Sequence, residues 1–173
     1  HGLGNSFLKN GDWYTSKSTG SADADVIVKT VVAIGGLLAS TREDSMYYRL
    51  GSVAGEPLRL NCRYRIEGND YDADWWSITA YGTDYFLIPN RDKRYSFNNE
   101  NLTRGEDGRW VIQIGTQQEE GNWLPVGPSG SPAESQSSDY DFDLLLRLYT
   151  PGAAYLQQPE SAPLPVVTLE SCS

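Results

Sequence analysis

The fold is decided by the stretch Asp74-Trp75-Trp76-Ser77-Ile78-Thr79-Ala80-Tyr81-Gly82-Thr83-Asp84-Tyr85-Phe86-Leu87-Ile88-Pro89-Asn90, which Arg94-Tyr95-Ser96-Phe97 follows. Two short runs rich in aromatic and β-branched residues, separated by Gly82-Thr83-Asp84, predict a β-hairpin. Side chains alternate between the two faces of a strand, so the first run has an apolar face (Trp76, Ile78, Ala80) and a mixed face (Trp75, Ser77, Thr79, Tyr81). We expect the apolar face in the core. The mixed face suits a core, a subunit interface or a ligand-binding wall.

The rest of the chain predicts further strands rather than a helical bundle. Seventeen Gly and nine Pro residues lie between short apolar runs, a distribution typical of many turns. Residues 116–141 are expected as a long polar loop, and the prolines between 151 and 165 are expected to exclude a regular helix. The predicted strands outside the first run cover residues 45–50, 58–66, 95–97, 110–114, 142–149 and 166–169.

The N-terminal part is expected to differ from the rest. Residues 1–20 predict an extended arm, and residues 21–173 predict a single β-sandwich domain. Within that domain, a candidate cap at Ser21 and apolar residues at helical spacing (Ile27, Val31, Ile34, Leu38) predict a helix at about 23–39.

The charge balance excludes two classes of partner. The formal net charge is -9, and no basic cluster reverses it locally. An acidic surface repels the phosphates of nucleic acids and the headgroups of anionic membranes. We therefore expect neither as the main partner. The longest apolar run, residues 26–39, is also shorter than the roughly 20 residues that a membrane-spanning helix needs.

The inventory of reactive side chains is small. His1 is the only histidine and lies at the terminus. A Ser-His-Asp triad therefore lacks a plausible base, and a histidine-rich metal site lacks its ligands. We expect no metal and no cofactor. Cys62 and Cys172 are far apart in the sequence and form either a disulfide or two idle thiols.

Six motifs follow one another in order, at residues 76–81, 87–90, 94–96, 107–108, 122–125 and 146–151. This series resembles the domain of unknown function 1214 family, over roughly residues 45–173. Short stand-alone bacterial members of this family imply an antiparallel jelly-roll-like sandwich, outside the cytoplasm, whose precursor begins with a hydrophobic anchor. They carry cysteines at the positions of Cys62 and Cys172, so the resemblance favours a disulfide in the oxidising periplasm or cell envelope.

Arg147 is the most informative polar residue, because it interrupts the apolar run Leu144-Leu145-Leu146-Arg147-Leu148. A buried guanidinium needs a carboxylate partner or a wet cavity. One hypothesis pairs Arg147 with Asp143 or Asp84 to lock the sheets. The other places Arg147 in a pocket that binds an anion.

Two functions are compatible with these patterns. The first is a non-catalytic cell-envelope module that binds a small anionic or carbohydrate ligand or plays an accessory structural role, with self-association into a homo-oligomer as an option. The alternative is a carbohydrate-active hydrolase that uses a carboxylate pair drawn from acids such as Asp72, Asp74, Glu119, Glu120, Asp139, Asp141 and Asp143. No catalytic residue is assigned. The candidate ligand-binding residues are Arg94, Arg147, Trp123 (as a pocket lid), Asn90, Tyr149 and Ser77.

Overall fold

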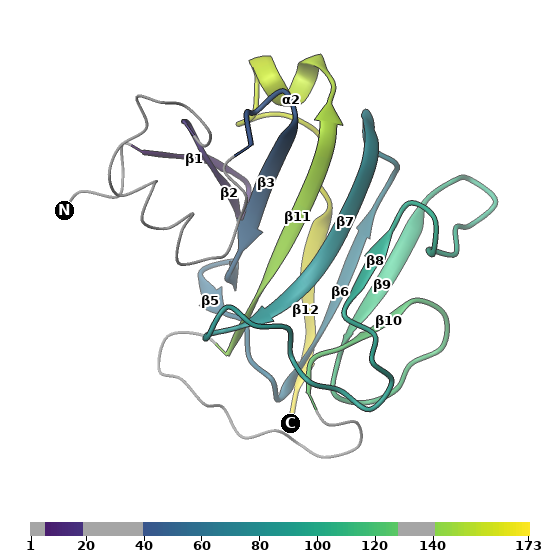
Figure 1. Cartoon of the computed structure of the whole chain (residues 1–173). Coiled ribbons are helices and arrows are strands. Elements are labelled where there is room, and N and C mark those ends of the chain that lie inside the picture. Colours follow the sequence, from purple (N-terminus) through teal and green to yellow (C-terminus); the bar gives the residue numbers. More distant parts are fainter. Residues whose placement is uncertain (1–5, 19–39, 128–140) are drawn as a thin grey trace.

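The computed structural model of the chain describes residues 6–18, 40–127 and 141–173. The predicted helix at 23–39 and most of the second half of the predicted loop lie outside these residues. Within them the fold is all-β, with two main sheets that pack face to face (Figure 1). No helix in these ranges is long and apolar enough to cross a membrane.

The larger sheet has six strands, all paired antiparallel, and its centre is formed by β3, β11 and β7. Residues expected as an extended arm form β1 and β2, a hairpin that extends this sheet at one edge. At the other edge β8 pairs with β7. In sheet order the strands are β1 Phe7–Asn10, β2 Trp13–Ser16, β3 Ser45–Leu50, β11 Phe142–Pro151, β7 Ala73–Gly82 and β8 Ser96–Asn98.

The smaller sheet has four strands, and its edge strand β12 carries the end of the chain. A separate two-stranded hairpin, β4 and β5, connects β3 to this sheet. Only the β10–β9 pair is parallel among the described strands. In sheet order the strands are β10 Trp123–Pro125, β9 Trp110–Gly115, β6 Cys62–Gly68 and β12 Val166–Cys172, and the hairpin consists of β4 Ser52–Val53 and β5 Glu56–Pro57.

The core lies between the two sheets. Trp76 of β7 stacks on Trp110 of β9 with ring centroids 5.3 Å apart, and Tyr64 of β6 meets Phe142 of β11 edge to face. Leu144, Leu146 and Leu148 are fully buried on the same side of β11. Each of these side chains removes a large apolar surface from water, so this layer supplies most of the hydrophobic stabilisation.

The prediction of which side chains of β7 and β11 face the core is confirmed. Trp76, Ile78 and Ala80 point into the core, whereas Trp75 and Tyr81 are only partly buried. On β11, Arg147 and Tyr149 lie opposite the leucines. The outer face of the six-stranded sheet therefore carries the mixed set of aromatic and hydroxyl side chains.

The second arm of the predicted hairpin is not a regular strand. Between β7 and β8 the chain makes only an isolated bridge, Tyr81 to Leu87, and Phe86 is largely exposed. Tyr85 has a φ of 66°, a conformation that a continuous strand does not allow. This segment therefore runs as an irregular loop along the outer face of the sheet.

Two other expectations are also corrected. Part of the loop predicted at 116–141 forms β10, because its apolar residues pair with β9 and are buried. A short helix, α2 Ala153–Gln157, forms where prolines were expected to exclude one. It fits between Pro151 and Pro159, so neither ring interrupts its hydrogen bonds, and it buries Tyr155.

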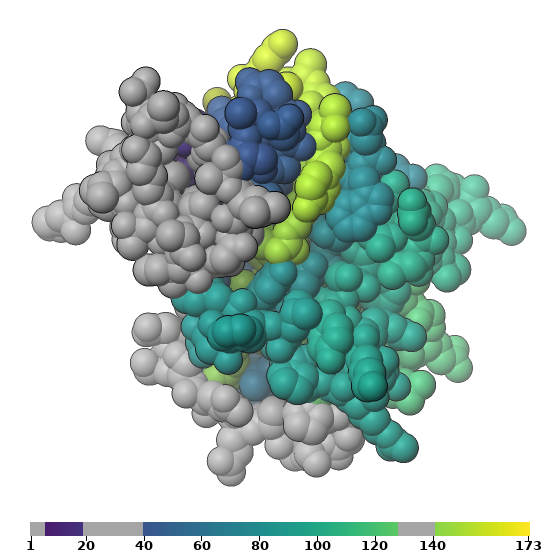
Figure 2. Space-filling model, viewed as in Figure 1, coloured from purple at the N-terminus to yellow at the C-terminus, as the bar shows by residue number. Residues whose placement is uncertain are grey.

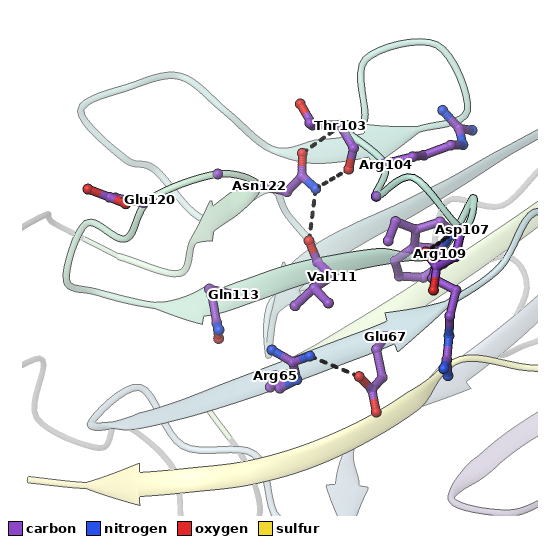
Figure 3. A pocket seen from close by; sticks show the side chains of 13 residues that line it. Arg65, Glu67, Thr103, Arg104, Asp107, Arg109, Val111, Gln113, Glu120 and Asn122 are labelled. Carbon is purple, nitrogen blue, oxygen red and sulfur yellow. Dashed lines mark hydrogen bonds and ion pairs between the residues drawn. The ribbon is translucent and has the colours of Figure 1, made fainter.

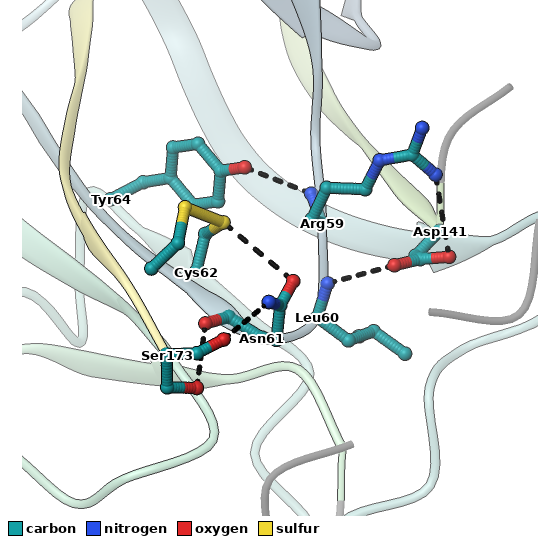
Figure 4. The surroundings of a disulfide bond; sticks show 8 residues. Arg59, Leu60, Asn61, Cys62, Tyr64, Asp141 and Ser173 are labelled. Atoms are coloured by element: carbon teal, nitrogen blue, oxygen red, sulfur yellow. Dashed lines mark hydrogen bonds and ion pairs between the residues drawn. A yellow bond between two sulfur atoms is a disulfide. The ribbon is translucent and has the colours of Figure 1, made fainter. Parts of the chain in front are cut away.

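Cys62 and Cys172 form a disulfide, with an S–S distance of 2.03 Å. The bond joins directly paired positions of β6 and β12. Beside it, the Asn61 side-chain amide donates to the Ser173 carbonyl at 2.7 Å, and the Ser173 amide donates to the Asn61 carbonyl (Figure 4). The disulfide prediction is confirmed, and the bond secures the last strand to the sheet.

Candidate functional site

A cleft of about 530 Å³ lies on the outer face of the six-stranded sheet. In the space-filling view β11 and β7 lie side by side in the middle of this face, with β3 beside β11 (Figure 2). The strands supply the floor, and Leu87 and Tyr95 of the irregular loop supply part of the wall. The lining residues are Tyr47, Trp75, Ser77, Thr79, Tyr81, Leu87, Tyr95, Ser96, Arg147 and Tyr149.

Arg147 is the one charged residue among those that line this cleft. Its guanidinium donates to the Thr79 hydroxyl at 3.3 Å and to the Tyr81 hydroxyl at 2.5 Å. It also lies over the Tyr81 ring, 5.3 Å from the ring centroid. These partners satisfy donors and orient the group, but they are neutral. Among the described residues, none forms a salt bridge with Arg147.

The predicted pairing of Arg147 with Asp143 or Asp84 is therefore wrong. Asp143 pairs instead with Arg49 of β3, whose Nε donates to the carboxylate at 2.6 Å. The Asp84 carboxylate accepts a hydrogen bond from the backbone N–H of Phe86 and stabilises a turn. Arg49 comes from a strand 94 residues away in sequence, so no local pattern identified it as the partner.

Burial dominates the electrostatics of Asp143, whose side chain is 2% exposed. Loss of hydration raises the pKa of Asp143 from 3.8 to about 6, and the positive charge of Arg49 lowers it only in part. The carboxylate is thus costly to ionise despite its partner. Asp143 faces the same side of β11 as Arg147 but is not among the residues that line the cleft.

Aromatic side chains flank Arg147. Trp75 and Tyr149 lie directly opposite each other on β7 and β11, edge to face, with centroids 5.5 Å apart. Tyr47 of β3 lies opposite Arg147 on its other side, and its hydroxyl accepts a hydrogen bond from Ser45. The strand alternation predicted Trp75, Ser77 and Tyr149 on this face. It did not indicate that β3 would bring Tyr47 beside them.

Three of the predicted site residues do not line this cleft. Arg94 donates to the carbonyl of Trp123 at 3.1 Å, and the Asn90 side chain bonds the backbone of Arg94 within the loop. Trp123 is 2% exposed and donates its indole N–H to the Gly115 carbonyl, so it lies in the protein interior rather than at a pocket mouth. These residues fix the loop to β10.

A second cleft, of about 580 Å³, lies over the outer face of β6 and β9 (Figure 3). Its charged groups are mixed in sign: Arg65 pairs with Glu67, and Arg104 pairs with Asp70 outside the cleft. Asn122 uses its side chain to join the loop at Thr103 to the Val111 carbonyl. Trp110 is the one aromatic residue that lines it.

The described residues contain no group of three or more potential metal ligands. We expect a melting temperature that is unchanged in excess EDTA, because neither the disulfide nor the core depends on a cation. Differential scanning calorimetry with and without EDTA, followed by elemental analysis, checks this. A stoichiometric zinc, iron or copper ion that is removed with a drop in melting temperature would contradict the prediction.

Two face-to-face sheets, a shared aromatic core and a cross-strand disulfide define the molecule as a small disulfide-bonded β-sandwich domain. Sequence comparison confirms the expected family. The chain belongs to the family described as "Protein of unknown function (DUF1214)", whose model matches residues 44–153. No curated protein matches the sequence.

Two solved structures are similar to the chain. The VPA0106 protein from Vibrio parahaemolyticus aligns with a TM-score of 0.65 and 19% identity, over 86% of this chain and 36% of that one. A putative uncharacterized protein from Burkholderia cenocepacia aligns with a TM-score of 0.43 and 15% identity, over 78% of this chain and 31% of that one. The chain thus spans about a third of the length of either protein. The first likeness supports the fold, and neither bears on a reaction.

Proposed function

We propose that this domain is a non-catalytic module that binds a small anionic ligand in the cleft on the outer face of the six-stranded sheet. The observation that carries the proposal is that Arg147 lines this cleft without an ion-pair partner among the described residues. Its charge lies among neutral hydroxyl and aromatic groups, and no carboxylate of the described residues forms an ion pair with it. A partly buried cation that is oriented but not neutralised suits a ligand that supplies the opposite charge.

The contrast between two arginines supports this interpretation. Arg49 and Arg147 lie on neighbouring strands and the same face of the sheet. Arg49 forms an ion pair with a buried carboxylate, whereas Arg147 faces the cleft. Arg49 therefore neutralises the buried carboxylate of Asp143, whereas the guanidinium of Arg147 is available to an anionic ligand in the cleft.

The distribution of side chains favours binding over hydrolysis. A glycosidase needs two carboxylates about 5 to 10 Å apart across the sugar, with aromatic rings to hold it. No carboxylate belongs to the residues that line the aromatic cleft. Glu67, Asp107 and Glu120 line the second cleft, which has a single aromatic residue. Of these two clefts, one has the aromatic rings and the other has the carboxylates. A third cleft contains Asp84 and Asp141, but Asp141 is buried and accepts the Leu60 backbone N–H, so the hydrolase is the weaker candidate.

We also propose that the domain works outside the cytoplasm, in the periplasm or cell envelope. The Cys62–Cys172 bond supports an oxidising compartment, because cytosolic thiols are kept reduced in most organisms. The membrane anchor in the precursor, the jelly-roll type of the sandwich, the N-terminal helix and a homo-oligomeric state stay predictions from the sequence and the family resemblance.

Replacement of Arg147 by methionine is expected to weaken anion binding about ten- to hundredfold and leave the fold intact. Methionine keeps much of the apolar stem, and the variant loses two hydrogen bonds to neutral groups rather than an ion pair. Each lost hydrogen bond contributes about 0.5 to 1.5 kcal/mol, so the free energy of unfolding should fall by less than about 3 kcal/mol. Urea unfolding measures the stability, and NMR titration with acetate, benzoate and D-glucuronate measures the binding.

Arg109→Met is the matched control, because it removes the same charge from the second cleft. It should bind the anions as the wild type does. The proposal fails if none of the three anions binds the wild-type protein, or if Arg147→Met binds them equally well. A loss of 3 kcal/mol or more in Arg147→Met would instead show that this arginine serves the scaffold.

A further inference from the structure

We infer that the ligand of this cleft is a sugar acid, a pyranose ring that carries one carboxylate, as in a uronic acid. This inference rests on the proposed function, in which Arg147 binds the negative charge of the ligand. Three features of the cleft specify the rest of the ligand: the donors of the guanidinium that Thr79 and Tyr81 do not use, the position of the nearest aromatic pair, and the hydroxyl groups that line the cleft.

The remaining N–H donors of the Arg147 guanidinium favour a ligand with a single carboxylate. The guanidinium has five N–H donors in a planar fork, and the hydrogen bonds to Thr79 and Tyr81 account for two of them. The remaining donors match a carboxylate, which accepts two parallel hydrogen bonds from such a fork. With no second cation among the lining residues, a ligand with several negative charges would be neutralised only in part.

The aromatic pair Trp75 and Tyr149 favours a ligand with an apolar surface at one end. Tyr149 and Trp75 form the row next to Arg147 and Ser77 on the sheet. Side chains two residues apart on a strand emerge about 7 Å from each other. A six-membered ring placed over Trp75 and Tyr149 therefore brings a carboxylate attached to that ring within reach of Arg147.

The third feature separates a sugar acid from an aromatic acid. The residues that line the cleft include hydroxyl groups from Ser77, Thr79, Ser96, Tyr47 and Tyr95 beside the aromatic rings. Hydroxyls both donate and accept hydrogen bonds, so they match the several hydroxyls of a pyranose. Thr79 and Tyr47 already accept hydrogen bonds from Arg147 and Ser45, and a benzoate-like ligand would offer no hydroxyl to Ser77, Ser96 or Tyr95. A pyranose presents C–H groups on one face for the rings and hydroxyls at its edge.

The test compares ligands that differ in one group, with NMR titration of the wild-type protein as the readout. D-Glucuronate is the probe. D-Glucuronamide keeps the ring and replaces the carboxylate by a neutral amide, and benzoate keeps a ring and the carboxylate but has no hydroxyls. We expect glucuronate to bind at least tenfold more tightly than either, because each comparison removes one of the matched interactions.

The variants should separate the two parts of the site. Arg147→Met should weaken glucuronate binding about ten- to hundredfold, as expected for loss of charged hydrogen bonds, and leave the weak affinity for glucuronamide unchanged. Trp75→Ala should weaken both sugars by a similar factor. Arg109→Met should change neither.

Two outcomes overturn the inference, and they differ in what they say about the proposed function. If benzoate binds through Arg147 and glucuronate binds no more tightly than glucuronamide, the sugar-acid assignment is wrong while the anion-binding function stands. If neither benzoate nor glucuronate binds, both are wrong. A trimer of galacturonate that binds more tightly than the monomer would support the inference and identify a polysaccharide as the source of the sugar acid.

Discussion

Reduction of the Cys62–Cys172 bond is expected to lower the free energy of unfolding by about 4 kcal/mol. The bond closes a loop with a sequence separation of 110 residues, and the chain-entropy relation gives about 4.7 kcal/mol for a loop of about 100 residues. Native-state strain and residual structure in the unfolded chain commonly reduce this value. The loss is large compared with the roughly 5 to 15 kcal/mol by which a domain of this kind is stable.

The position of the bond adds a local effect. β12 is the edge strand of the four-stranded sheet and pairs only with β6 among the described strands. Most of its side chains are exposed, so little apolar burial holds it in place. We therefore expect β12 to be the first strand to lose amide-exchange protection after reduction.

Urea unfolding with and without a phosphine reductant measures the stability, and hydrogen exchange by mass spectrometry locates the change. The double variant Cys62→Ala, Cys172→Ala is the control, because the reductant should have no effect on it. Alkylation of the unfolded, unreduced protein should find no free thiol. A reductant effect below about 0.5 kcal/mol would contradict the entropic role of the bond.

Replacement of Arg49 by methionine is expected to destabilise the protein by about 3 to 5 kcal/mol at pH 7.5. The change leaves the Asp143 carboxylate buried without its cation, and removal of one partner from a buried pair typically costs this amount. The variant also loses the contact of the guanidinium with the Tyr85 ring, whose centroid lies 4.9 Å away. The same change at Arg147 has the smaller effect stated above.

The pH dependence of the Arg49→Met variant identifies the cause. In the wild type, the pKa of Asp143 is about 6, above its value in an unfolded chain of about 3.9. The unfolded state thus releases its proton first as the pH rises, and the stability contributed by protonated Asp143 is present below pH 4 and lost through pH 6. Without Arg49 this pKa rises further. The difference between variant and wild type should therefore shrink toward pH 5 and grow above pH 7.

Chemical denaturation at a series of pH values from 4.5 to 8 provides this curve. The double variant Arg49→Met, Asp143→Asn is the control, because its stability relative to Asp143→Asn should not follow the same pH dependence. A destabilisation by Arg49→Met that is equal at pH 5 and pH 7.5 would mean that packing, rather than the buried charge, accounts for the role of Arg49.

Local patterns in the sequence determined which side chains face inward. The period of two in β7 and β11 placed Trp76 and the leucines in the core and placed Trp75, Arg147 and Tyr149 on the opposite face. Alternation is a property of the strand itself, so it needs no knowledge of the neighbouring strands. The resemblance of ordered motifs indicated the family and the cysteine pairing.

Only the tertiary structure decided which of these side chains meet. Arg49, rather than Arg147, reaches Asp143, because β3 pairs with β11 in a register that no local pattern specifies. The same pairing brings Tyr47 beside Arg147 and completes the cleft. The motifs indicated Trp123 and Arg94 as site residues. However, β10 pairs with β9, and Arg94 donates to the Trp123 carbonyl, so neither residue lines the cleft. A partner that is distant in the chain is chosen by the packing of the whole sheet, and this is why the sequence alone indicated the residues of the site but not their arrangement.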